Sequence, residues 1–182
     1  MTNFSVPTRE QVTPKNQEIF DNLKKQVGFV PNLYATYAHS ETALGDFLTL
    51  SGRITSLSGK EKEIINLVVS EVNNCAYCKA AHTAIGKMNG FTDEQILEIR
   101  SGAASFDSKY DTLAKFVKNA VENRSHPDAE VVDNLLAAGY TKENLIDAIM
   151  VIGEKTISNF VHGTSHVPVD FPAAQELAPV LV

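Results

Sequence analysis

The stretch between residues 63 and 82 reads EIINLVVSEVNNCAYCKAAH and contains both cysteines of the chain, Cys75 and Cys78. Cys78 follows Cys75 by three positions and His82 follows Cys78 by four. On an α-helix of 3.6 residues per turn, these three side chains share one face. The asparagines at 73 and 74 are poor helix-interior residues and good N-caps, which indicates that a new helix begins near Cys75. The sequence therefore predicts two sulfur atoms and an imidazole on one helix face.

The start of a helix favours a reactive thiol. Unpaired backbone N–H groups and the positive end of the helix dipole stabilise a thiolate and so lower the pKa of a cysteine there. A thiolate can attack the O–O bond of a peroxide to give a sulfenic acid, which condenses with a second thiol to form a disulfide. His82 can carry the proton, because the ordinary pKa of histidine is near neutrality. This interpretation requires the two sulfurs to lie within bonding reach of each other and to be accessible to an oxidant.

A carboxylate would complete such a proton relay, and two candidates precede the cysteines. Glu71 lies four residues before Cys75, so a continuous helix would place it on the reactive face. Glu63 lies twelve residues before Cys75, roughly 18 Å along an unbroken helix, and reaches the thiols only if the chain bends at the asparagines. Spacing alone favours Glu71, although a solvated or ion-paired role fits that residue as well. Without further context, Glu63 is interpreted as a surface charge in the run 60–63.

The rest of the chain divides into helix-length pieces, and no useful strand alternation occurs. Hydrophobic residues make up 43% of the 182 positions, enough to fill a core. We expect an all-α fold in which residues 1–182 form a single domain. The predicted helices cover 14–27, 31–38, 41–53, 59–72, 75–89, 93–101, 108–123, 127–138 and 142–161.

Two apolar patterns carry information about packing. Leu113, Phe116, Val117, Ala120 and Val121 have the spacing of one helical stripe, which predicts a face resting on the core. The run 145–152 is apolar nearly all the way round, so we expect it to be buried on several sides, either centrally or against another subunit. Prolines at 168, 172 and 179 disfavour a helix near the C-terminus, and residues 167–182 are expected to form an arm over the body or over a neighbour.

Composition excludes several classes of function. Lys and Arg number 16 against 22 Asp and Glu, which gives a formal net charge of −6, and the basic residues are scattered. Such a surface repels nucleic acid. No apolar run has the length needed to cross a bilayer, and the N-terminus lacks the pattern of a secretory signal. We therefore expect a cytoplasmic protein without nucleic-acid or membrane partners.

The pattern from Glu63 to His82, Glu-x11-Cys-x2-Cys-x3-His, resembles that of the alkylhydroperoxidase D and carboxymuconolactone decarboxylase superfamily, in particular its peroxidase-related members. The residues around the pattern, LSGKEKEII at 57–65 and VSEVNNCAYC at 69–78, also resemble the family. The resemblance in the core extends from about residue 41 to 123. The segments FVPNL at 29–33 and VPVDF at 167–171 resemble the larger peroxidase-related subgroup.

The resemblance implies an all-helical protein whose subunits associate, commonly as trimers or hexamers, and which reduces hydroperoxides without haem or flavin. We expect no cofactor and no metal site. Position by position, it assigns Cys78 as the peroxide-attacking cysteine and Cys75 as the resolving cysteine that also meets the electron donor. It assigns Glu63 and His82 to the proton relay. The implied partners are a hydroperoxide substrate and a dithiol protein or small-thiol reductant. Tyr77 stands where well-studied members have a second histidine, and tyrosine is a poor base near neutral pH.

Three alternatives stay open at this stage. One is a lactone decarboxylase or another small-molecule enzyme of the same superfamily, although that branch generally lacks the CxxC pair. A second is a thiol switch or a zinc-stabilised interaction module, with His162 or His166 completing a site made by the cysteines and His82. The third is a pair of buried, inert thiols. Gly163 and Ser165 indicate that a helix is ending near the two later histidines, which favours a capping role for them.

Overall fold

The computed structural model describes residues 4–178, and within them it contains α-helices, one short 3-10 helix and no strand. The prediction of an all-α fold is confirmed. The described elements are η1 (Arg9–Gln11), α1 (Pro14–Val27), α2 (Asn32–Tyr37), α3 (Ala43–Ser51), α4 (Gly59–Val72), α5 (Ala76–Met88), α6 (Asp93–Ser101), α7 (Ser108–Glu122), α8 (Ala129–Ala137) and α9 (Lys142–Ser165).

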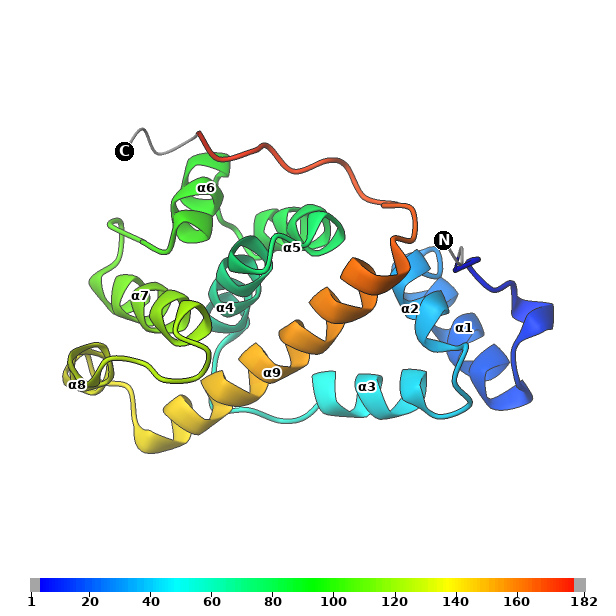
Figure 1. Cartoon of the computed structure of the whole chain (residues 1–182), viewed down its shortest axis with the longest axis horizontal. Helices are drawn as coiled ribbons and strands as arrows, with labels where there is room; N and C mark the ends of the chain where they lie inside the picture. The colour runs from blue at the N-terminus through cyan, green and yellow to red at the C-terminus, as the bar shows by residue number, and fades with distance from the viewer. Residues whose placement is uncertain (1–3, 179–182) are drawn as a thin grey trace.

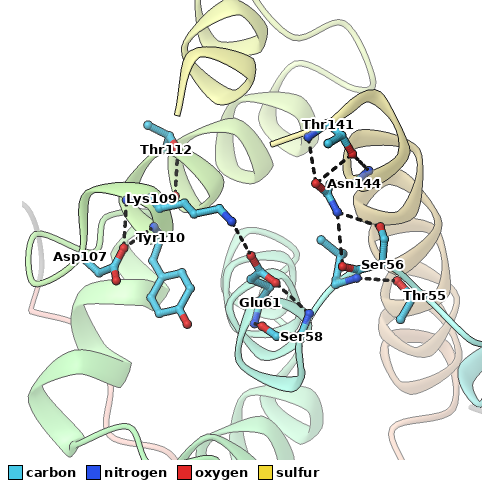
Figure 2. Close-up of polar contacts among 11 residues, drawn as sticks. Thr55, Ser56, Ser58, Glu61, Asp107, Lys109, Tyr110, Thr112, Thr141 and Asn144 are labelled. Atoms are coloured by element: carbon cyan, nitrogen blue, oxygen red, sulfur yellow. Dashed lines mark hydrogen bonds and ion pairs between the residues drawn. The ribbon is translucent and has the colours of Figure 1, made fainter. Parts of the chain in front are cut away.

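Helix α4 is the centre of the fold. Its apolar side chains are buried on all sides, because α4 packs against α5, α6, α7 and α9. The helix begins at a capping box in which the Ser58 hydroxyl accepts from the Glu61 N–H and the Glu61 carboxylate accepts from the Ser58 N–H. Figure 2 shows that Glu61 also pairs with Lys109 of α7, while Ser56 bonds to Asn144 of α9. These contacts fix α4, and with it Glu63, against two neighbouring helices.

Helix α9 runs across the molecule, with α1 to α3 on one side and α4 to α8 on the other (Figure 1). It continues to Ser165, four residues beyond the predicted end at 161, and it ends beside His166, as Gly163 and Ser165 indicated. The helix ends at His166, whose positive φ of 51° and N–H bond to the His162 carbonyl form the C-cap.

The predicted packing stripe on α7 is confirmed, with Val121 half-buried and its other members buried. The run 145–152 is not buried on all sides within the single chain, as a central helix would be. Ala148 and Val151 are buried, whereas Ile146, Ile149 and Met150 are exposed in the single chain. The central helix is α4 instead, with Ile64, Ile65 and 67–70 all buried.

Residues 167–178 contain no helix and lie over the body as an arm, which passes from the end of α9 beyond α5 to α6 (Figure 1). The Asp170 carboxylate accepts from the Asn32 N–H at 2.7 Å. Further along, the Arg100 Nη1 donates to the Gln175 carbonyl at 2.5 Å. The arm therefore connects α2 at one end with α6 at the other. The final part of the expected arm, 179–182, lies outside the described residues.

Within residues 4–178, none of the helices combines the length and the apolar character that crossing a bilayer requires.

Candidate active site

A bend at Asn73 and Asn74 folds α5 back beside α4. Asn74 has a positive φ of 49°, and the N–H groups of Asn74 and Cys75 bond to the carbonyls of Glu71 and Ser70. Asparagine is one of the few residues besides glycine that adopts this left-handed conformation readily. The side chain of Asn73 adds a 2.8 Å bond to Asn159 of α9. Hydrogen bonds to α4 and to α9 therefore fix the conformation of this turn.

The bend brings Glu63 of α4 against His82 of α5. The Glu63 Oε1 lies 2.6 Å from the His82 Nδ1, and both side chains are buried. The second carboxylate oxygen accepts from the Asn66 Nδ2 at 3.3 Å. Since Nδ1 donates to a carboxylate, the lone pair of the neutral imidazole lies on Nε2. Glu63 thus orients a ring whose other nitrogen can accept a proton.

Several groups act on the charge of His82. Burial lowers the pKa of His82 from its ordinary value, the Glu63 carboxylate acts in the opposite direction, and the positive charge of Lys155 lowers the pKa further. The net direction is downward. The imidazole is therefore neutral at neutral pH, which is the form that accepts a proton.

The two cysteines occupy the start of α5. Cys75 is its N-cap, and the Cys75 sulfur accepts from the Cys78 N–H at 3.2 Å. The sulfur atoms are paired as a disulfide, with the Cα atoms 5.3 Å apart, within the usual range for such a bond. Both residues are buried, with exposed fractions of 3% for Cys75 and 2% for Cys78. The pairing therefore needs no unwinding of the helix, and access to the sulfurs depends on a cavity.

A cavity of about 720 Å³ provides that access. Cys78, His82 and Glu63 line it together with mostly apolar side chains from several helices and from the arm, including Leu33, Tyr34, Ile85, Val151 and Phe171. Cys75 is not among the described residues of the cavity wall. Of the two cysteines, Cys78 is therefore the one that lines the space where a small molecule can enter.

Tyr77, between the cysteines, has a structural position. Its hydroxyl accepts from the Leu33 N–H at 3.3 Å, and its ring packs against those of His162 and Phe171. Burial raises the pKa of the phenol well above its ordinary value. The side chain therefore connects α5 with α2, α9 and the arm, and it does not supply a base.

Glu71, which spacing alone favoured, lies elsewhere. Its Oε2 is 2.7 Å from the Arg100 Nη2 and 2.8 Å from the Arg100 Nε, and it does not line the cavity. Lys79 lies 3.9 Å from the other carboxylate oxygen. The bend at Asn74 turns the reactive face away from Glu71 and toward Glu63. Glu71 is the ion-paired residue that the sequence also allowed.

The structure does not assemble the proposed zinc ligands. Within residues 4–178, no group of three or more His, Cys, Asp or Glu side chains is placed to hold a metal ion. His166 is the cap of α9, and the ring of His162 packs on Tyr77.

Sequence reasoning did not identify the charged residues Lys62, Glu154 and Lys155 in the cavity wall, and the buried one among them is Lys155 of α9. Its neighbours at 148, 151 and 158 form the buried stripe of α9, so the helical spacing places Lys155 on that inward face. This helical spacing is the feature of the sequence from which Lys155 could have been identified.

Residues 41–114 match the model of the carboxymuconolactone decarboxylase family. The chain therefore contains a segment similar to that family, which supports the resemblance to the alkylhydroperoxidase D and carboxymuconolactone decarboxylase superfamily. The whole fold resembles that of a peroxidase-related protein described as having an alkylhydroperoxidase core, from Ralstonia eutropha JMP134, with a TM-score of 0.83, 20% identity and 92% of each chain covered. A peroxidase-related protein from Silicibacter sp. TM1040 gives a TM-score of 0.79 and 22% identity, over 90% of this chain and 89% of that one.

A third solved structure of this superfamily fold is a cysteine-to-alanine variant of the debrominase Bmp8 in complex with 2,3,4-tribromopyrrole. Its TM-score is 0.77 with 16% identity, over 93% of this chain and 92% of that one. A search of curated proteins finds no significant match. At these identities, the solved structures establish the fold alone.

Proposed function

We propose that this protein is a thiol-dependent hydroperoxide reductase. One observation carries the proposal: Cys78 and the Glu63–His82 pair face the same cavity, at the start of a helix that favours a thiolate. The resemblance to the superfamily and the fold shared with peroxidase-related proteins support it. A dithiol protein or a small thiol supplies the electrons, in the reducing environment of the cytoplasm.

The reaction begins with the reduced protein. The His82 Nε2 accepts the proton of the Cys78 thiol, and the thiolate attacks the terminal oxygen of the hydroperoxide. The O–O bond breaks, Cys78 becomes a sulfenic acid, and the departing alkoxide takes up a proton to become an alcohol. The Cys75 sulfur then attacks the Cys78 sulfur, and the hydroxyl group leaves with a proton as water. The resulting disulfide accepts two electrons and two protons from the dithiol donor.

The test is consumption of cumene hydroperoxide in the presence of dithiothreitol. The parent protein is expected to turn over, whereas Cys78→Ser is expected to lose activity. Cys75→Ser forms the sulfenic acid without resolving it, so dimedone is expected to label Cys78 in that variant. Peroxide consumption by Cys78→Ser equal to that of the parent would show that the assignment is wrong. Release of carbon dioxide from carboxymuconolactone would favour the lactone decarboxylase instead.

The proposal includes assembly with further copies of the chain. One exposed stripe along α9 consists of Ile146, Ile149, Met150, Ile157 and Phe160, and the exposed fraction of Phe160 is 70%. Large apolar stripes of this kind mark protein interfaces. The association of subunits that the family resemblance implies makes a second copy of this chain the occupant.

A further inference from the structure

Lys155 is a buried cation without a partner. Its exposed fraction is 6%, and within residues 4–178 no carboxylate lies within ion-pair distance of its ammonium group and no acceptor bonds to it. Lysines are almost never this buried unless they are paired. The other buried cations follow that rule, because Arg100 pairs with Glu71 and Lys79 bonds to Asn74 and Glu176. Packing alone therefore does not explain Lys155.

Lys155 lines the cavity that Cys78 and His82 also line. The charged groups that affect the pKa of Lys155 are Glu154 of its own helix and Glu63 of α4. Lys155 in turn affects the pKa of His82 of α5. Burial lowers the pKa of Lys155, while the two carboxylates act in the opposite direction. The cavity therefore brings together the His82 imidazole of α5 and the Lys155 amine of α9, and Lys62 of α4 and Glu154 of α9 also line it.

Peroxide reduction involves a proton acceptor for the attacking thiol and a proton donor for the departing oxygen. The attacking sulfur and the departing oxygen lie in line on opposite sides of the oxygen that is transferred. His82 is one helical turn from Cys78 and so lies on the side of the sulfur. The departing oxygen points away from that side. A donor from another helix is needed there, because an alkoxide is a poor leaving group until it is protonated.

We infer that Lys155 is the general acid that protonates the departing alkoxide when Cys78 reduces a hydroperoxide, an inference that rests on the proposed function. The O–O electron pair leaves with the alkoxide, which takes a proton from the Lys155 ammonium to give the alcohol. Neutral Lys155 regains a proton from solvent within the cavity. A lowered pKa makes the ammonium a stronger acid and so suits it to this step.

The test compares two oxidants whose leaving groups differ in basicity, and for each oxidant the variant is compared with the parent. tert-Butyl hydroperoxide releases a strongly basic alkoxide, whereas peracetic acid releases acetate, which needs no proton. Lys155→Met is expected to slow oxidation of Cys78 by tert-butyl hydroperoxide about 100-fold and to change the rate with peracetic acid less than about twofold. Lys155→Arg keeps the positive charge but holds its proton too tightly, so we expect the same selective loss. Lys142→Met, at an exposed lysine of the same helix, is the matched control and should match the parent with both oxidants.

The outcomes separate this inference from the proposed function. Equal losses with both oxidants, or no loss with either, would overturn the role of Lys155 while leaving the peroxidase assignment in place. A parent protein inactive toward both oxidants would overturn the two together. Folding is checked by thermal melting. Lys155→Met is expected to melt no lower than the parent, because replacing an unpaired buried charge with an apolar side chain is often stabilising.

Discussion

Glu63 and His82 are nineteen residues apart in the sequence, yet the Glu63 carboxylate lies 2.6 Å from the His82 Nδ1 inside the protein. The contact depends on the bend between α4 and α5, and it determines which nitrogen of the imidazole is free. A carboxylate–imidazole pair of this kind orients the ring and increases its basicity.

Glu63→Gln should therefore weaken proton transfer without removing the thiols. Loss of the carboxylate removes an effect that raises the pKa of His82, so the imidazole becomes a weaker base. We expect the alkylation rate of Cys78 in the reduced protein to fall about 10-fold to 100-fold. The pH below which this rate declines should also shift to a lower value. Iodoacetamide labelling against pH measures both. Glu130→Gln, at an exposed carboxylate of α8, is the control; an unchanged profile in Glu63→Gln would contradict the relay.

The buried imidazole of His82 should make stability fall on mild acidification. Its folded-state pKa is lowered, so below the unfolded value of 6.5 the unfolded chain binds a proton that the folded chain resists. Stability is therefore lost as the pH falls from about 6.5 toward the folded pKa. We expect His82→Gln to reduce the loss between pH 7.5 and 5.5 by up to about 1 kcal/mol, measured by urea unfolding of the oxidised protein. Identical pH dependence in both proteins would be inconsistent with the lowered pKa.

Tyr77→Phe should affect stability more than chemistry. The substitution removes the acceptor of the buried Leu33 N–H and keeps the ring against Phe171. We expect a loss of about 1–2 kcal/mol in the free energy of unfolding, with peroxide reduction within about twofold of the parent. Tyr110→Phe on α7 serves as the control. A large loss of activity in folded Tyr77→Phe would point to a direct role in proton transfer.

Arg100→Met should release the C-terminal arm. The guanidinium is buried and bonds to Glu71 and to the Gln175 carbonyl, so its removal leaves a partly buried carboxylate and a free carbonyl. We expect a loss of about 2–4 kcal/mol in unfolding free energy, and faster hydrogen exchange in the arm. Arg9→Met breaks an exposed pair with Asp21 and should cost no more than about 1 kcal/mol. Equal effects of the two substitutions would argue against a structural role for the Arg100 contacts.

Phe160→Asp should reduce self-association. Light scattering of the parent is expected to give a multiple of the 19.8 kDa chain mass, and the charge on the exposed stripe of α9 should shift the protein toward the monomer. Ile54→Asp places the same charge on an exposed loop residue and should leave the assembly unchanged. A parent protein found only at the chain mass would contradict the proposed assembly.

The sequence contained enough information for most of the helices and part of the site. The capping boxes at Ser58–Glu61 and Thr92–Gln95 indicated where α4 and α6 begin, because their side-chain bonds are local. The choice between Glu63 and Glu71 was different. It depended on a single left-handed residue, Asn74, whose effect on the path of the chain is set by packing between distant helices.

The sequence alone did not identify Lys155 as a residue of the site, for a similar reason. The apolar spacing of α9 identifies its inward face, but which helices bring Cys78 and His82 opposite that face follows only from tertiary packing. The end of α9 was placed four residues early, at 161, although Gly163 and Ser165 correctly indicated that the helix ends near His166.

The single left-handed turn at Asn74 also restricts how this chain can change in length. One residue added or deleted between Glu63 and Cys75 would rotate one helix relative to the other by about 100°. The carboxylate would then point away from the imidazole even though every side chain was still present. The length of the eleven-residue segment between Glu63 and Cys75 therefore determines whether the carboxylate and the imidazole meet. Insertions that the surface loops tolerate should be poorly tolerated in this segment.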